Sequence, residues 1–282
     1  MTTSTPPAFS LLLPVYHGDD AAQLRRSIRS ATVEQRLAPD EVVLVQDGPV
    51  GPALAGVVAE IESSAEKVTV VRLERNVGLA LALEAGLARC SHEIVARTDA
   101  DDVCLPERFA RQVPLVAEGY DIVGSAIQEF VTEDAPGHVR VPPLSSRDIA
   151  SAARFRSPFN HPTVVYRRSA VEAAGGYQDL ALLEDYWLFA RMLHAGARAV
   201  NLPEPLLLYR VGAGAYARRG GRRILGSEIE LQKRLRRLGF TTRLQAVRNV
   251  LVRGGYRLVP EGLRRRSYRQ FMLGRTGDGA AA

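Results

Sequence analysis

Four short apolar segments, separated by stretches with helical spacing, occupy the first hundred residues of the chain. The apolar segments are residues 9–16 (FSLLLPVY), 41–45, 68–73 and 93–97. Apolar residues recur at helical spacing between them, over 21–32, 54–65 and 79–89. A short strand that is apolar throughout is buried on both faces, and strands that alternate with helices form parallel sheets with right-handed crossovers. We therefore expect an α/β domain built on a mostly parallel sheet.

The second part of the chain has a less regular pattern. We expect strands at 122–130 and 163–166, and helices at 106–118, 147–155 and 186–195. From Gly220 onward the pattern is helical and basic. These elements predict a continuation of the same domain, followed by a helical C-terminal region.

Polar residues stand where the four predicted strands end: Tyr16, Asp47, Asn76 and Asp99. In an open parallel sheet, ligands bind beyond the carboxyl ends of the strands. We therefore expect these four side chains to converge on one crevice.

The fourth strand leads into residues 99–102 (Asp-Ala-Asp-Asp), here called the acidic turn. Its three carboxylates repel one another unless a positive charge lies between them. Ligands that are oxygen only suit Mg²⁺ or Mn²⁺, and Mg²⁺ fills its shell with water and substrate phosphates. The acidic turn thus predicts a divalent cation and a bound diphosphate.

Two other interpretations of the acidic turn fit its residues less well. An EF-hand loop needs Gly at its sixth position and Glu at its twelfth, where this chain has Cys104 and Ala110. Asp102 alone could cap a turn before the helix that begins near Pro106, but capping does not explain three aspartates.

Glu184 and Asp185 form a second acidic pair, at the start of a predicted helix. Helix capping and the helix dipole explain either residue alone. The functional alternative is a general base that accepts a proton from an attacking hydroxyl.

Two further polar residues have open interpretations. His161, within Asn-His-Pro-Thr, is a candidate metal ligand, a phosphate contact or a polar loop residue. Arg97 either meets a diphosphate or neutralises the neighbouring aspartates.

Charge is distributed unevenly along the chain. The net charge is +6, yet residues 218–275 contain 17 Lys and Arg against three acidic residues, so the body is acidic and the tail is basic. Such a tail suits anionic lipid, nucleic acid or an acidic partner, or is simply a solvated helical surface. It has few interleaved aromatic residues, which disfavours a base-stacking platform, so no nucleic-acid partner is expected.

Other features predict the compartment and exclude some nucleotide sites. Two cysteines, Cys90 and Cys104, without a signal peptide or a long apolar run, predict a cytoplasmic protein. No Walker A motif is present, and the glycines of 212–217 lack the βαβ context of a dinucleotide site.

Several ordered motifs resemble one family. LLLPVYHGD, VVLVQDGP, ERNVGLALALEAGL, IVARTDADDVCLPERF, FNHPTVVYRRSAVEAAGGY and LLEDYWLFARMLHAGA are similar to glycosyltransferase family 2, and more narrowly to its bacterial amylovoran, capsule and O-antigen members. The resemblance spans about residues 9–220, and YARRGG with the following basic helices is also similar to that subgroup.

The resemblance implies a GT-A fold (Rossmann-like, mostly parallel, flanked by helices) with a basic helical C-terminal extension. It implies a GT-A domain over 1–217, with a nucleotide-sugar half at about 9–105 and an acceptor half at about 106–217, and a basic region over 218–282. The implied reaction is an inverting transfer from a nucleotide-diphosphate sugar, with UDP expected, assisted by Mn²⁺ or Mg²⁺. The processive Gln-x-x-Arg-Trp motif is not found in the sequence, which favours transfer of a single sugar.

The resemblance also implies roles for individual residues. The nucleobase is expected between Pro14, Val15, Tyr16 and Asp47, while Asn76, Gly78 and Arg97 are expected on the donor. Asp99 is expected at the ribose and Asp101 on the metal, with His161 as a further candidate ligand. Asp185 is expected to be the catalytic base, with Glu184 as the reserve candidate.

The implied acceptor is a glycan or a lipid-linked sugar of a cell-surface polysaccharide, and residues 220–275 are expected to associate peripherally with the inner face of the cell membrane. A sugar-1-phosphate nucleotidyltransferase is the competing enzyme, but it needs a Gly-rich basic loop where this chain has Pro14-Val15-Tyr16-His17. A non-catalytic nucleotide-sugar or nucleic-acid binding protein is the alternative that is not an enzyme.

Overall fold

The computed structural model describes residues 7–64, 67–211 and 222–255, which form two compact units. The first unit contains the chain up to Asp179 and Glu184–Arg210, and the second contains Leu180–Leu183 and the chain from Val211 onward. The domain boundary predicted at 217–218 lies outside the described residues.

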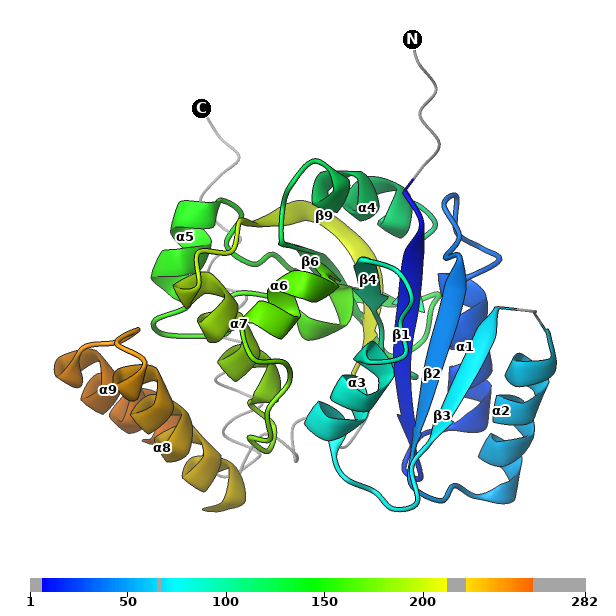
Figure 1. The fold of residues 1–282 in the computed structure, drawn as a ribbon, viewed down its shortest axis with the longest axis horizontal. Helices are drawn as coiled ribbons and strands as arrows, with labels where there is room; N and C mark the ends of the chain where they lie inside the picture. Colours follow the sequence, from blue (N-terminus) through cyan, green and yellow to red (C-terminus); the bar gives the residue numbers. More distant parts are fainter. Residues whose placement is uncertain (1–6, 65–66, 212–221, 256–282) are drawn as a thin grey trace, which may run out of the picture. The chain divides into compact units, whose positions relative to one another are not determined.

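The first unit is built on one mixed sheet (Figure 1), with strand order β3-β2-β1-β4-β8-β6-β9-β5 among the described residues and β7 paired to β6. The strands are β1 (Phe9–Tyr16), β2 (Glu41–Asp47), β3 (Val68–Arg72), β4 (Ile94–Arg97), β5 (Val103–Cys104), β6 (Ile122–Phe130), β7 (Pro136–Arg140), β8 (Val165–Arg167) and β9 (Ala199–Arg210). Strands β3, β2, β1 and β4 are parallel, β8 is antiparallel to β4 and β6, and β9 is parallel to β6.

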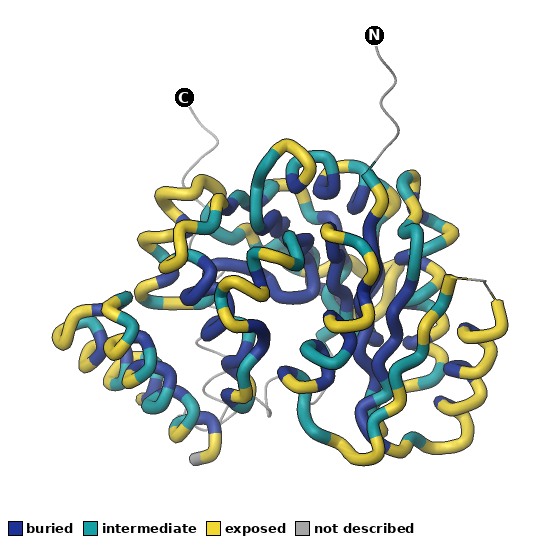
Figure 2. Tube along the Cα trace, viewed as in Figure 1, coloured by how far each residue is buried: buried dark blue, intermediate teal, exposed yellow. Residues whose placement is uncertain are grey.

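Helices of the first unit cover both faces of this sheet, and alternate strand residues point to opposite faces. Leu12 and Val43 pack in one core with residues of α3 (Leu79–Leu87), α5 (Ser146–Ala152), α6 (Arg168–Ala173) and α7 (Glu184–His194). Leu11 and Leu13 pack on the other face with residues of α1 (Ala21–Ala31), α2 (Pro52–Ser64) and α4 (Arg108–Ala117). Buried positions accordingly follow the strands, while the outer sides of the helices are exposed (Figure 2).

The predicted strands and helices of the first hundred residues are confirmed to within two residues at every end. The sequence pattern missed β9, because Pro203 and Pro205 interrupt its apolar run and proline is unfavourable inside a strand. The structure accommodates the interruption with register shifts between β6 and β9, around the pairing of Ala126 with Pro205.

The second unit contains three helical segments among the described residues: α8 (Arg222–Arg237), α9 (Arg243–Asn249) and the π-helix η3 (Val250–Gly254). A capping box of Thr242 and Gln245 begins α9, and Asn249 and Val250 both have helical backbone angles, so η3 continues α9 without a break. Both segments pack against α8. No described helix is long and apolar enough to cross a membrane.

Candidate functional site

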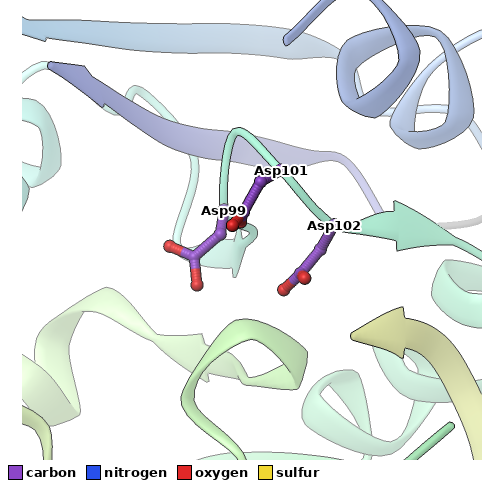
Figure 3. Close-up of side chains that lie close together, drawn as sticks. All are labelled: Asp99, Asp101 and Asp102. Carbon is purple, nitrogen blue, oxygen red and sulfur yellow. The ribbon is translucent and has the colours of Figure 1, made fainter. Parts of the chain in front are cut away.

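The acidic turn joins β4 to β5 and is held from two sides. The Ser27 hydroxyl on α1 donates to the Asp99 carbonyl at 2.7 Å. At the end of β9, Arg210 Nε donates to the Asp101 carbonyl at 2.8 Å, and the Arg210 backbone N–H donates to Asp102 Oδ1 at 2.9 Å. The three aspartate side chains leave this turn toward the same side (Figure 3). The backbone of the turn is therefore fixed before any ligand binds.

Arg97, the last residue of β4, provides a positive charge beneath the acidic turn. Its side chain is 1% exposed, and both of its Nη atoms donate to the Asp99 carboxylate, one of them at 2.9 Å. Burial and a neighbouring carboxylate act on it in opposite directions, and the net effect raises the pKa of Arg97. Arg97 thus forms a buried ion pair with Asp99, and its contact with a diphosphate stays a prediction.

The donor atoms of the acidic turn suit a divalent cation. One oxygen each from Asp99, Asp101 and Asp102 lies within 4.8 Å of the others. Asp102 is 1% exposed, and its buried Oδ2 has no hydrogen-bond partner. Burial and then repulsion by Asp101 and Asp99 raise the pKa of Asp102 well above its usual range. A cation relieves both penalties, because it gives the orphaned oxygen a partner and offsets the repulsion.

Asp47, Asn76 and Gly78 are brought together, as their predicted positions at neighbouring strand ends require. The buried Asp47 carboxylate accepts hydrogen bonds from Asn76 Nδ2 at 2.9 Å and from the N–H groups of Val77 at 2.7 Å and Gly78 at 3.1 Å. Gly48 allows this approach, since its φ is +84° and a Cβ there would lie 2.4 Å from Asn76 N. Asp47 therefore shapes the loop after β3, and its contact with a nucleobase stays a prediction.

The end of β1 lies beside that loop. Tyr16 pairs in register with Asp47, and Pro14 and Val15 pair with Val45 and Gln46. The Tyr16 N–H donates to Asp19 Oδ2 at 2.9 Å, and its ring meets the His17 ring edge-on with 5.2 Å between centroids. These contacts set the direction in which β1 ends, next to the predicted nucleobase position.

The Glu184–Asp185 pair forms the first turn of α7, in the same unit as the acidic turn. Glu184 is 7% exposed, and burial together with the charge of Asp185 raises the pKa of its carboxyl to about 7. The charges of Arg97 and Asp99 also act on Glu184. The charges around the acidic turn thus reach Glu184, and the second cluster contains a carboxyl whose pKa lies near neutral pH.

His161 is buried in the interior of the unit. Its Nε2 lies 3.0 Å from the Tyr177 hydroxyl, and its ring meets Phe189 edge-on with 5.8 Å between centroids. Burial, and then the charge of Arg97, lower the pKa of His161 well below its usual range, so the ring is neutral. In the part of the chain that the structure describes, the group of clustered metal donors contains the three aspartates and does not include His161. Its role as a metal ligand stays a prediction.

Sequence reasoning missed the residues that support the acidic turn. Ser27 lies on a helix face and carries no motif of its own. Arg210 is the last residue of the unpredicted β9, and its guanidinium stacks 4.5 Å from the Phe130 ring centroid. The one sequence signal for Arg210 was the pair Tyr209-Arg210, which follows the apolar run 206–208.

Comparison with known proteins identifies relatives along most of the chain. The model of the family "Glycosyl transferase family 2" matches residues 10–174. Amylovoran biosynthesis glycosyltransferase AmsE of Erwinia amylovora is 38% identical over 254 residues, covering 89% of this chain and 94% of that protein. UDP-Gal:alpha-D-GlcNAc-diphosphoundecaprenol beta-1,3-galactosyltransferase of Escherichia coli is 32% identical over 272 residues, covering 94% and 96%.

Two solved structures share the fold at low identity. Mannosyltransferase PcManGT from Pyrobaculum calidifontis, in complex with GDP-Man and Mn²⁺, has a TM-score of 0.66 at 19% identity, over 99% of this chain and 77% of that chain. TarS residues 1–349 of S. aureus, in complex with UDP-GlcNAc, has a TM-score of 0.63 at 16% identity, over 97% and 76%.

Proposed function

Because the chain belongs to glycosyltransferase family 2 and has the predicted GT-A fold, we propose that it transfers a single sugar, with inversion, from a UDP-sugar to a glycan or lipid-linked acceptor. The observation that carries the proposal is the acidic turn, whose three clustered carboxylates, one of them with a buried oxygen that has no hydrogen-bond partner, suit a divalent cation. A nucleotidyltransferase is not favoured by these relatives.

The donor half of the proposal uses the strand ends. Pro14, Val15, Tyr16 and Asp47 bracket the nucleobase, and Asn76, Gly78 and Asp99 contact the rest of the nucleotide. Hydrogen bonds between Asp47 and the loop that contains Asn76 and Gly78 support this arrangement, since they organise the loop in advance.

The proposed binding site of the divalent cation is the acidic turn. Asp101 would hold the ion with help from Asp102, whose buried oxygen has no hydrogen-bond partner, and His161 is a further candidate ligand. Mn²⁺ is the first ion to test, since PcManGT carries it, and Mg²⁺ is the second. When bound, the cation stabilises the charge that grows on the leaving nucleoside diphosphate. Arg97 supports this site, because it fixes the Asp99 carboxylate and supplies a buried positive charge.

We assign the catalytic base to Asp185, with Glu184 as the reserve. The base accepts the proton of the acceptor hydroxyl while that oxygen attacks the anomeric carbon from the side opposite the leaving group. The raised pKa of Glu184 supports proton exchange within the pair near neutral pH, and it makes the reserve candidate worth testing.

The acceptor is proposed from the relatives and from the basic tail. The E. coli relative is named for a diphosphoundecaprenol-linked acceptor. An acceptor of this class lies at the cytoplasmic membrane face, so we propose peripheral association through residues 220–275, where each Lys or Arg near an anionic surface contributes about 1 kcal/mol. Part of that range lies outside the described residues.

Nucleotide-sugar turnover tests the proposal. The purified full chain is screened against UDP- and GDP-sugars with Mn²⁺ or Mg²⁺, for thermal stabilisation and for release of the nucleoside diphosphate. We expect stabilisation by a UDP-sugar and metal-dependent release, both lost in Asp101→Ala. An Asp134→Ala variant, in the exposed turn before β7, is the matched control and should behave as the unmodified chain. Absence of stabilisation by every nucleotide sugar in either metal would contradict the proposal.

A further inference from the structure

We propose that the outer face of α9 and η3 inserts into the headgroup layer of an anionic lipid bilayer. This inference rests on the proposed function, because it supplies the means by which the enzyme stays at a surface that carries a lipid-linked acceptor. It goes beyond charge attraction by the basic tail, since it assigns binding to four apolar side chains. We call Leu244, Val247, Leu251 and Val252 the apolar stripe.

The apolar stripe is exposed to an unusual degree. The exposed fractions are 84% for Leu244, 58% for Val247, 69% for Leu251 and 58% for Val252. All four lie within one continuous helical segment, spaced by three, four and one residues. Single exposed apolar residues are ordinary on a protein surface, but several on one helix face indicate an interaction site.

The face of this segment that packs against α8 combines the buried Ala246 and Gly254 with buried polar contacts. Arg253 Nε donates to Glu228 Oε1 at 2.7 Å, Gln232 Nε2 donates to the same oxygen at 3.1 Å, and Asn249 Nδ2 donates to Gln232 Oε1 at 3.1 Å. Glu228 and Asn249 are fully buried. A rotation of the helix that buried its leucines would place them against the polar groups of α8 and break this buried network. The free-energy cost of leaving buried polar and charged groups unpaired is high.

The π-helical turn contributes to the same arrangement. Residues Val250–Gly254 form η3, a rare geometry that is frequent at functional sites. Within it, Leu251 and Val252 are both exposed, while Gly254 is buried and Arg253 reaches Glu228 on α8. The widened turn thus places two consecutive apolar side chains outward and still keeps the buried ion pair.

Charge selects lipid among the possible occupants of the apolar stripe. Residues 222–255 contain nine Lys and Arg and two acidic residues. Both acidic residues are paired internally, Glu228 with Arg253 at 2.7 Å and Glu230 with Arg234 at 3.0 Å. A second copy of this face would bring like charges together, and a nucleic acid would leave the stripe in water. An apolar face with arginines beside it, such as Arg243 and Arg248, is typical of a helix that lies in a membrane interface.

A tryptophan reporter in the full chain tests insertion directly. Leu251→Trp places an indole on the apolar stripe, and its emission is compared without vesicles, with phosphatidylcholine vesicles, and with vesicles that contain phosphatidylglycerol. The spectrum of the unmodified chain is subtracted, because the buried Trp187 also contributes to the emission. We expect a solvent-exposed spectrum without vesicles and a blue shift only with phosphatidylglycerol. A blue-shifted spectrum without vesicles would overturn the proposal. If the shift is present at every protein concentration, the same chain covers the apolar stripe. If it appears only at high protein concentration, a second copy covers the stripe.

Vesicle co-sedimentation measures what the stripe contributes. Leu244→Gln/Leu251→Gln should lower the partition coefficient onto phosphatidylglycerol vesicles about tenfold, at both low and high salt. Arg243→Gln/Arg248→Gln should lower it about tenfold at low salt and much less at high salt. The matched control is Val33→Gln/Val141→Gln, at exposed apolar positions of the first unit, and it should bind as the unmodified chain does. Unchanged binding by the leucine variant would overturn the proposal.

Failure of this inference is separable from failure of the proposed function. Thermal stabilisation by a UDP-sugar with Mn²⁺ involves no vesicle, so it should be the same in Leu244→Gln/Leu251→Gln and in the unmodified chain. If the nucleotide sugar stabilises the chain normally and the chain does not bind vesicles, membrane insertion is overturned and the proposed function is not. Normal vesicle binding with no stabilisation by any nucleotide sugar overturns the proposed function.

Discussion

The acidic turn and the Glu184–Asp185 pair are both carboxylate clusters, but different forces organise them. Ser27, Arg210 and Arg97 hold the turn by hydrogen bonds to its carbonyls and carboxylates. Burial and a neighbouring like charge dominate at Glu184, and they raise the pKa of its carboxyl to about 7. Burial and like charge also raise the pKa of Asp102 in the first cluster, but there the hydrogen bonds hold three carboxylates at fixed positions, which suits cation binding. The second contains a carboxyl that changes its protonation state near neutral pH, which suits proton transfer.

The largest expected effect separates binding from proton transfer. Asp185→Asn should lower kcat about 10³-fold and leave the Kd for a UDP-sugar with Mn²⁺ unchanged, because an amide cannot accept the proton. Asp101→Asn should instead abolish the Mn²⁺-dependent part of donor binding. Steady-state kinetics and calorimetric titration measure the two quantities.

Glu184→Gln is the matched control for the assignment of the base. If Glu184→Gln loses turnover and Asp185→Asn keeps it, the base is Glu184. If both variants turn over normally, the second cluster has no role in proton transfer.

The next largest effect concerns the buried guanidinium of Arg97, which pairs with Asp99 of the acidic turn. Arg97→Gln should lower the free energy of unfolding by about 3 kcal/mol, because it leaves Asp99 beside two other carboxylates without its partner. Chemical denaturation measures the loss, and added Mn²⁺ should reduce it by supplying positive charge. Arg25→Gln is the control: Arg25 pairs with Glu60 on the surface, with side chains 54% and 57% exposed, and no measurable change is expected. An equal loss with and without Mn²⁺ would show that Arg97 acts only in packing.

The second cluster makes stability depend on pH with a defined sign. The pKa of Glu184 is about 7 in the folded protein against an ordinary value of 4.5, so the folded state binds more protons between these values. Its stabilising contribution is complete below pH 4.5 and is lost as pH rises through 7. The difference in free energy of unfolding between Glu184→Gln and the unmodified chain should therefore grow by about 2 kcal/mol from pH 5 to pH 8 in favour of the variant. A difference independent of pH would contradict the raised pKa.

The same contrast explains what the sequence could predict. Strand and helix positions up to β4 were predictable because their apolar periods are local, and the acidic residues were visible as uncommon runs after a strand end and at a helix start. Contacts between distant segments were not. The supports of the acidic turn come from α1 and from a strand broken by two prolines, and neither Ser27 nor Arg210 has a distinctive neighbourhood in the sequence. The buried polar contacts of α9 and η3 were hidden for the same reason, since the partners Gln232 and Glu228 lie on another helix.

The smallest expected effect tests whether the acidic turn is held in advance. Ser27→Ala removes the buried hydroxyl that donates to the Asp99 carbonyl at 2.7 Å, and it should lower the free energy of unfolding by about 1 kcal/mol. Because the turn then loses one of its supports, the Kd for Mn²⁺ in the presence of UDP should rise about threefold, while kcat at saturating metal stays unchanged. Ser63→Ala is the control, since that exposed hydroxyl donates to Glu60 within α2 and neither quantity should change. A stability loss without any change in Mn²⁺ affinity would mean that Ser27 supports the fold and that Arg97 and Arg210 suffice to position the carboxylates.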